Sequence, residues 1–283
     1  MRDRSDMNLG HRTIQLLLAT SLLGVFTGSA LAQTARAPFE PWVGQDGKDV
    51  IWVPTPTVLV EKMLDIAEVT KEDYVIDLGS GDGRNVIAAA KRGAQALGVE
   101  YNNDMVEYSR RAAAREGVAD KAIFVQGDMF EADISKATVM ALFLLTDNLR
   151  QLTPKLYGLS PGTRIVANTF GIEGWTAEAT HKVEGDCEFW CEILLYIVPA
   201  KVAGTWRLAQ GELTLNQNFQ TVSGTLAAGG TSTPIANGRL RGDQITFTAG
   251  NVEYAGRVNG DTMRGDAKDS SSTWTATRLP AAQ

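Results

Sequence analysis

Short apolar runs and amphipathic segments follow one another between residues 58 and 198. The run at 139–145 is apolar nearly throughout, which is typical of strands buried on both faces of a parallel sheet. We expect strands at 74–78, 97–100, 123–125, 139–145, 164–169 and 189–198. The segments between them carry apolar residues on one helical face, and we expect helices at 58–69, 86–91, 104–116 and 149–156. The alternation of strand and helix predicts an α/β fold with a doubly wound, mainly parallel sheet.

A different pattern begins at Val202, where apolar and polar residues alternate with a period of two. The runs expected to be strands are 204–208, 212–215, 221–226, 244–248, 252–256 and 272–276. Residues that favour hairpin turns recur among them, namely Asn237-Gly238, Gly242-Asp243, Asn259-Gly260-Asp261 and Gly265-Asp266. About eight strands in so short a stretch predict a small antiparallel barrel or sandwich. We therefore expect an α/β domain at 33–201 and an all-β domain at 202–283. The Trp and Tyr residues of the second domain are interpreted first as its core, with a ligand-binding calyx or a docking module as the open alternatives.

The first 32 residues have the pattern of a secretory signal peptide. Three arginines precede an apolar run at 14–26, and small residues at Ala30 and Ala32 form a cleavage motif before Gln33. A membrane-spanning helix needs about 20 apolar residues, so this run is short for a span. We expect an exported, periplasmic protein; the alternative is an inner-membrane anchor formed by residues 14–31.

The chain of 283 residues has an ordinary globular composition, with 44% hydrophobic and 21% charged residues. Its formal net charge of −6 gives no basic signature, so we expect no nucleic-acid partner. Two histidines and two cysteines leave little material for a metal site, and we expect none. On one extended strand the Cα atoms of Cys187 and Cys191 would lie about 13 Å apart, beyond the bridging limit of about 7 Å. We therefore favour two free thiols, although export would permit a disulfide.

The most informative segment is Asp77-Leu78-Gly79-Ser80-Gly81-Asp82-Gly83, which follows an expected strand and precedes an expected helix. Glycine lets the backbone approach a ligand without a Cβ clash, and a helix N-terminus offers free N–H groups. The spacing D-x-G-x-G-x-G differs from the dinucleotide pattern G-x-G-x-x-G, whose third glycine would fall on Arg84. The acid before the glycines suits a ligand that carries an ammonium group rather than a pyrophosphate.

Two more acids end the next two expected strands. Glu100 lies 21 residues after Gly79, where a carboxylate can accept hydrogen bonds from both ribose hydroxyls. Asp128, at the end of the third strand, can accept from an adenine amino group while Met129 covers the base. Together with the glycine turn, these acids predict a site for S-adenosylmethionine.

Residues 53–170 resemble the class I, seven-strand methyltransferases. The resemblance is to the branch that contains the ATP-synthase c-subunit lysine methyltransferases, the adenine-nucleotide-translocase lysine methyltransferases and bacterial relatives. The matching segments are Val53-Pro54-Thr55-Pro56, 75–84, Gly98-Val99-Glu100, 124–130, 152–156 and 161–166. The chain departs from the family after the fourth strand, where Phe143-Leu144-Leu145-Thr146 replaces a segment like Tyr-Leu-Leu-Pro.

The resemblance implies a Rossmann-like sheet of seven strands, with the last strand antiparallel and strands six and seven within 181–185 and 189–198. It implies S-adenosyl-L-methionine as cofactor. The cofactor-binding residues it implies are Thr55, Asp77, Gly79, Ser80, Gly81, Gly83, Glu100, Tyr101, Asp128 and Met129. It also implies methyl transfer to an amine such as a protein lysine.

The acceptor side is less clearly marked. Thr146-Asp147-Asn148 stands where amide and adenine-N6 methylases carry an N/D-P-P-Y/F signature. Asn148 or Asp147 could orient an amine as catalytic residues, against a plain helix-capping role for Asp147. The acceptor could be a protein or a small molecule, and a membrane-associated acceptor stays open. The other functional alternative is a protein that binds S-adenosylmethionine and transfers nothing. The oligomeric state is not indicated by the sequence.

Overall fold

The computed structural model describes residues 39–185, 187–268 and 272–280. The expected signal peptide and its cleavage site before Gln33 lie outside these residues. None of the described helices is both long enough and apolar enough to cross a membrane.

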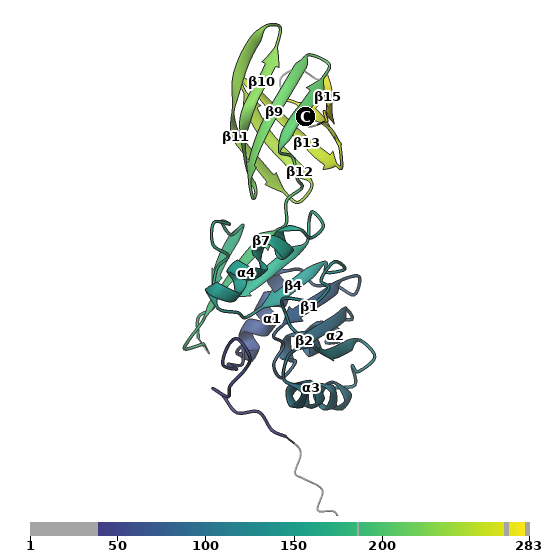
Figure 1. Ribbon diagram of the computed structural model, residues 1–283, viewed down its shortest axis with the longest axis vertical. Helices are drawn as coiled ribbons and strands as arrows, with labels where there is room; N and C mark the ends of the chain where they lie inside the picture. The colour runs from purple at the N-terminus through teal and green to yellow at the C-terminus, as the bar shows by residue number, and fades with distance from the viewer. Residues whose placement is uncertain (1–38, 186, 269–271, 281–283) are drawn as a thin grey trace, which may run out of the picture. The chain divides into compact units, whose positions relative to one another are not determined.

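Seven strands form one mixed sheet, of which β1, β2, β4 and β7 are labelled in Figure 1. The strand order is β3-β2-β1-β4-β5-β7-β6. Their bounds are β1 (Tyr74–Leu78), β2 (Gln95–Glu100), β3 (Ala122–Gln126), β4 (Val139–Leu142), β5 (Arg164–Asn168), β6 (Ala179–Lys182) and β7 (Glu192–Ile197). The first five are parallel, whereas β7 runs antiparallel to both β5 and β6. The α/β fold and the antiparallel seventh strand are thus confirmed.

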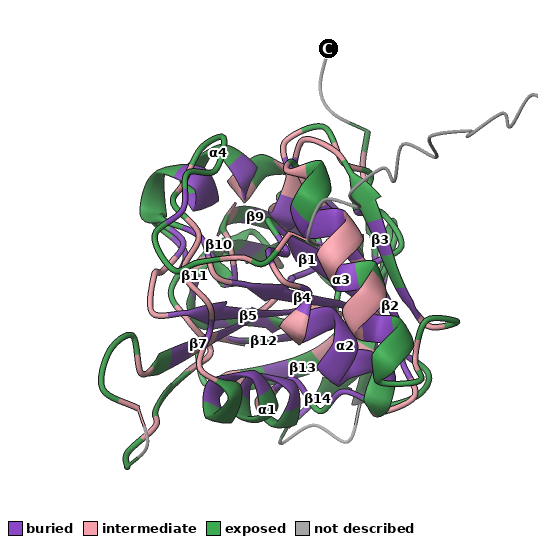
Figure 2. Cartoon of the chain, turned by 90° about the horizontal axis from the view of Figure 1, so that it is seen from below, coloured by how far each residue is buried: buried purple, intermediate pink, exposed green. Residues whose placement is uncertain are grey.

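Helices cover both faces of this sheet. Successive residues of each strand point to opposite faces, and the apolar side chains on each face pack against one layer of helices. The helices are α1 (Thr57–Ile66), α2 (Arg84–Lys91), α3 (Asn103–Arg115) and α4 (Thr146–Tyr157). Val75 and Val139 pack in one core with α1, α2 and α3, while Ile76 and Met140 pack in a second core with α4. Figure 2 shows the central strands buried between these helices. Burial on both faces explains why the central strands are apolar without alternation.

The chain order places a topological switch point between β1 and β4. From β1 the chain proceeds to β2 and β3 on one side, and then crosses to β4 on the other. In open α/β sheets, ligands bind beyond the carboxyl ends of the strands at such a point. The glycine turn after β1 and the segment after β4 therefore meet where a ligand is expected.

The C-terminal strands close into an eight-stranded antiparallel barrel, which settles the choice between barrel and sandwich. Their bounds are β8 (Gly204–Leu208), β9 (Gly211–Asn218), β10 (Thr221–Ala228), β11 (Thr231–Arg241), β12 (Gln244–Ala249), β13 (Val252–Asn259), β14 (Thr262–Ala267) and β15 (Ser272–Arg278). Trp206, Phe247, Tyr254 and Trp274 belong to its apolar core, and the rings of Phe247 and Tyr254 stack 4.8 Å apart. These rings act as core packing, as the sequence favoured over a calyx.

Two of the expected hairpin turns are wrong. Asn237-Gly238 lies inside β11, where Asn237 has φ +53° and the pairing with β12 shifts between Ala236 and Arg239. This is a β-bulge, which uses the same left-handed backbone as a hairpin turn. Gly265-Asp266 lies inside β14, where a Cβ on Gly265 would meet the backbone oxygen of Ala255 at 1.8 Å. Glycine is needed there because two backbones approach closely, and not because the chain turns.

The expectation of free thiols at Cys187 and Cys191 is also wrong. The two cysteines form a disulfide, with their Cα atoms 5.8 Å apart. They do not share an extended strand, because β7 begins only at Glu192 and Trp190 turns the chain with φ +56°. The extended geometry assumed from the sequence fails at that turn.

Candidate active site

The turn after β1 is shaped by glycines with left-handed backbone angles. Gly79, Gly81 and Gly83 have φ of +70°, +54° and +82°, values that side chains disfavour. Gly83 directly precedes α2, and a Cβ there would lie 2.6 Å from the ring of Phe124. Gly83 therefore allows the helix to pack closely on the sheet, while the earlier glycines shape the turn itself.

Bulky side chains lie close to both of these earlier glycines. A Cβ on Gly81 would lie 2.4 Å from Nε1 of Trp52, so the indole covers this part of the turn. A Cβ on Gly79 would lie 3.3 Å from Cδ2 of Leu144, which follows β4. The segment after β4 therefore lies close to the glycine turn, at the switch point.

Glu100 links the end of β2 to the glycine turn. Its Oε2 accepts a hydrogen bond from the backbone N–H of Gly81 at 2.9 Å, and its Oε1 accepts from Asn102 N–H at 2.9 Å. Each carboxylate oxygen can accept a second hydrogen bond. Glu100 therefore both fixes the turn and retains acceptor capacity for two hydroxyl groups.

Asp77 in β1 and Ser80 in the turn that follows are both buried polar residues. Asp77 is 3% exposed and accepts a hydrogen bond from Nδ2 of Asn85 at 3.0 Å. Burial raises the pKa of Asp77 well above its ordinary value, and the negative charge of Glu100 raises it further. The Oγ of Ser80 has no hydrogen-bond partner among the described residues. An ammonium group brought to this turn would stabilise the ionised form of Asp77.

The acid of the third strand is held by a lysine from the N-terminal segment. Asp128 accepts from Nζ of Lys48 at 2.5 Å and from the backbone N–H of Phe130 at 2.8 Å. The hydrogen bond from Lys48 lowers the pKa of Asp128, and that from Phe130 lowers it further. The same Nζ lies 5.3 Å from the ring centroid of Tyr101, an exposed residue.

A cavity of about 60 Å³ gathers several of the expected residues. Five of them line it: Gly79, Glu100, Tyr101, Asp128 and Met129. Asp77 lies buried in β1 and Ser80 in the glycine turn instead. Thr55 is also buried, and its carbonyl accepts a hydrogen bond from Arg84 at 2.6 Å.

Residues 45–50 and Trp52 also line the cavity, and no pattern in the sequence predicted this covering segment. Two backbone hydrogen bonds hold it, from Gly44 to Trp52 and from Trp52 to Gln45, both at 2.9 Å. The segment has no regular hydrophobic period, so only the tryptophans and prolines of the wider stretch 33–57 could have drawn attention.

These groups fit S-adenosylmethionine. Carboxylates at the ends of β1, β2 and β3 match an ammonium, a ribose and an adenine amino group, and Ser80 offers an unused hydroxyl. The described residues contain no group of three or more His, Cys, Asp or Glu that could hold a metal ion.

The two acceptor-side candidates have different surroundings. Asp147 lies in the first turn of α4, exposed and ion-paired with Arg150. The residue before the helix is Leu145, which makes no side-chain cap, so Asp147 is not the N-cap. Asn148 is 5% exposed, and its Oδ1 has no partner among the described residues. Nδ2 of Asn168, at the end of β5, also has none.

The chain is similar to known methyltransferases. A family model described as the ANTKMT methyltransferase domain matches residues 77–179. A protein-lysine N-methyltransferase of Saccharolobus islandicus is 43% identical over 152 residues, 53% of this chain and 94% of the relative. An ATP-synthase c-subunit lysine N-methyltransferase of Xenopus laevis is 37% identical over 165 residues, 57% of this chain and 70% of the relative.

A solved structure also resembles the chain. It is described as an RNA methyltransferase from Salinibacter ruber in complex with S-adenosyl-L-homocysteine, with 43% identity and a TM-score of 0.50. The match covers 53% of this chain and 96% of that one. With the glycine turn and the three strand-end acids, these matches show that the chain belongs to the S-adenosylmethionine-dependent methyltransferases of the protein-lysine N-methyltransferase family.

Proposed function

We propose that the protein transfers a methyl group to the side-chain amine of a lysine in a protein acceptor. The observation that carries this proposal is the relative from Saccharolobus islandicus, which is named for that activity and is matched over 94% of its length. The similar structure from Salinibacter ruber is described as an RNA methyltransferase, but the net charge of −6 disfavours a nucleic-acid acceptor for this chain.

The residues of this chain act by positioning rather than by covalent chemistry. Bound S-adenosylmethionine supplies an electrophilic methyl group on a sulfonium. Asp77, Glu100 and Asp128 orient the donor through its polar groups, so that the acceptor nitrogen can approach in line. A lysine amine has an unperturbed pKa of about 10.4 and must lose a proton before it attacks. Desolvation lowers that pKa, and no side-chain base is required.

Asn148 is our candidate for orienting the acceptor amine. Its Oδ1 is a buried acceptor without a partner among the described residues, and α4 carries it directly after β4. A neutral amine can donate a hydrogen bond to such an oxygen, which would direct its lone pair toward the methyl group. Exposed Asp147, which pairs with Arg150, is the weaker candidate.

We further propose that the protein is exported and that its acceptor is membrane-associated. The N-terminal pattern and the Cys187–Cys191 disulfide both support an oxidising compartment. Relatives named for the c-subunit of ATP synthase and for the adenine nucleotide translocase support a membrane acceptor. N-terminal sequencing of the protein recovered from the periplasm should begin at Gln33.

The test is incubation of the protein with S-adenosylmethionine labelled in its methyl group and with a membrane extract. The expected result is label on a protein, located on lysine by digestion and mass spectrometry, and strongly reduced with Glu100→Ala. Label on a small molecule or on RNA would refute the proposal. Tight S-adenosylhomocysteine binding without any label would indicate a protein that binds the cofactor and transfers nothing.

A further inference from the structure

The loop between β6 and β7 overhangs the edge of the sheet that carries the cofactor site. Because β7 runs antiparallel to β5, its first residues lie beside the end of β5, with Asn168 paired to Ile193. The backbone N–H of Thr169 donates to the carbonyl of Glu192 at 2.8 Å. The loop thus reaches the carboxyl edge, where the glycine turn also lies.

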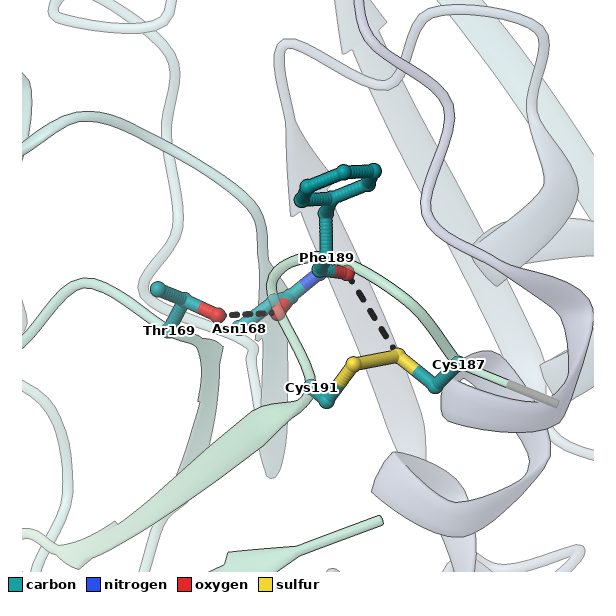
Figure 3. Close-up of a disulfide and its surroundings, with 5 residues drawn as sticks. All are labelled: Asn168, Thr169, Cys187, Phe189 and Cys191. Atoms are coloured by element: carbon teal, nitrogen blue, oxygen red, sulfur yellow. Dashed lines mark hydrogen bonds between the residues drawn. A yellow bond between two sulfur atoms is a disulfide. The ribbon is translucent and has the colours of Figure 1, made fainter. Parts of the chain in front are cut away.

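Two aromatic side chains within the disulfide-closed part of this loop are exposed to solvent. Phe189 and Trp190 lie between Cys187 and Cys191, and they are 69% and 43% exposed. Figure 3 shows the disulfide next to Asn168 and Thr169, with the ring of Phe189 projecting away from it. Trp190 has φ +56°, a conformation that costs free energy and persists only where the surroundings enforce it. The Cys187–Cys191 disulfide closes the short loop in which Trp190 takes this conformation.

An aromatic cluster connects this loop to the glycine turn. The ring of Trp190 lies 5.9 Å from that of Phe143, and Phe143 stacks on Phe170 at 6.3 Å between centroids. Phe143 directly follows β4, and the side chain of its neighbour Leu144 lies close to Gly79. The cluster therefore extends from the exposed loop to the end of β4 at the switch point.

Acidic side chains surround the exposed part of the cluster. Trp190 and the disulfide line an open cavity of about 530 Å³ together with Glu184, Glu188 and Glu192. Among the described residues of its lining, Lys182 alone is basic. None of the three carboxylates is ion-paired with another residue in the described part of the chain. Aromatic faces and unpaired carboxylates are the groups that attract an ammonium ion.

We propose that the disulfide-closed loop is the acceptor-binding element, and that it takes a polypeptide segment carrying a cationic lysine side chain. Trp190 and Phe143 contact the lysine side chain, and Glu184, Glu188 and Glu192 attract its charge. The disulfide is a positioning element, because it acts by presenting Trp190. This inference rests on the proposed function, and it names the surface by which the acceptor reaches the site.

The test measures binding of a fluorescein-labelled, capped peptide of alternating alanine and lysine, with an alanine–glutamate peptide as the non-binding control. Trp190→Ala should weaken lysine-peptide binding about threefold to thirtyfold, the range expected for loss of a cation–π contact. Trp190→Phe should restore most of the affinity. Cys187→Ser with Cys191→Ser should weaken binding to a similar extent, whereas Ile123→Ala, which removes an exposed apolar side chain from β3, should not.

A second measurement separates acceptor binding from cofactor binding. Trp190→Ala and Glu188→Gln should raise the KM for the protein that accepts the methyl group, while S-adenosylhomocysteine affinity stays unchanged. The unchanged cofactor affinity also shows that each variant is folded. Unchanged peptide affinity and unchanged acceptor KM in Trp190→Ala, Glu188→Gln and the double serine variant would overturn the inference. Binding of phosphatidylcholine vesicles that depends on Phe189 and Trp190, with no change in acceptor KM, would also overturn it and assign a membrane contact.

The outcomes for this inference and for the proposed function differ. A wild-type protein that binds the lysine peptide through Trp190 but never labels lysine would refute the proposed function and leave the binding surface intact. A wild-type protein that labels lysine, with variants of equal acceptor KM, would refute the binding surface and leave the function intact.

Discussion

Glu100 offers the sharpest test of the cofactor site. Its two oxygens already accept from Gly81 N–H and Asn102 N–H, and each retains a lone pair that a ribose hydroxyl can use. Glu100→Ala removes the hydroxyl contacts and also releases the glycine turn. Hydrogen bonds to a charged group contribute about 1.5–3 kcal/mol, so S-adenosylhomocysteine affinity should fall about tenfold to a hundredfold.

Glu100→Gln refines this prediction because it conserves volume and removes the charge. A glutamine amide presents one oxygen and one NH₂ group, so either Gly81 N–H or Asn102 N–H would face a donor. We therefore expect Glu100→Gln to lose most of the same affinity. Isothermal titration calorimetry with S-adenosylhomocysteine measures both variants, and circular dichroism shows whether they are folded. Wild-type affinity in a folded Glu100→Ala would place the ribose elsewhere and refute the assignment.

Three further perturbations test neighbouring parts of the structure. Gly81→Val should abolish S-adenosylhomocysteine binding as measured by calorimetry. The new Cβ would lie 2.4 Å from Trp52, and the φ of +54° disfavours a branched residue. Retained affinity in the folded variant would contradict this expectation. Since burial raises the pKa of Asp77, cofactor affinity should fall as pH is lowered through that raised pKa, and Asp77→Asn should remove this dependence in titrations of affinity against pH. Burial alone would raise the pKa of Asp73, but hydrogen bonds from Thr70 and Thr138 and the charge of Arg164 lower it overall. The contribution of ionised Asp73 to folding stability is therefore complete above its unfolded-state pKa and is lost as pH falls through the lowered native pKa. Asp73→Asn should lower the free energy of unfolding in urea by about 1–3 kcal/mol at neutral pH and by less in acid.

The glycine turn could be read from the sequence because its requirements are local. A strand, a left-handed turn and a helix follow one another within 74–91, and each glycine has a backbone reason to be there. The acids of the next two strands followed from chain order, because parallel strands bring their carboxyl ends to one edge. Longer-range contacts decided the remainder of the site.

The covering segment shows what local pattern cannot supply. Lys48 reaches Asp128 across 80 positions of sequence, and Trp52 reaches Gly81 without any helical or strand period. The disulfide was missed for a related reason, since one left-handed residue, Trp190, cancels the extended geometry that the spacing suggested. In the barrel, Asn237 was expected in a hairpin turn but lies in a β-bulge. The sequence does not separate these two features, because both use a left-handed backbone conformation.

The last prediction concerns the barrel, which we expect to be dispensable for cofactor binding. Every residue that lines the cofactor cavity lies between Gln45 and Met129. The barrel closes on itself, since β8 pairs with both β9 and β15. A chain ending at Ala200 retains all seven strands of the sheet and should bind S-adenosylhomocysteine within about threefold of the full-length protein.

Methyl transfer separates two roles for the barrel in that shortened chain. If the barrel only adds stability, the shortened chain should unfold at a lower temperature than the full-length protein. Labelling of a short lysine peptide and of the membrane acceptor should then fall together. If it recruits the acceptor, labelling of the short peptide should persist while labelling of the membrane acceptor is lost. Loss of cofactor binding in a shortened chain whose circular dichroism still shows a folded α/β domain would mean that the barrel contributes to the site, and the division at residues 201 and 202 would be wrong.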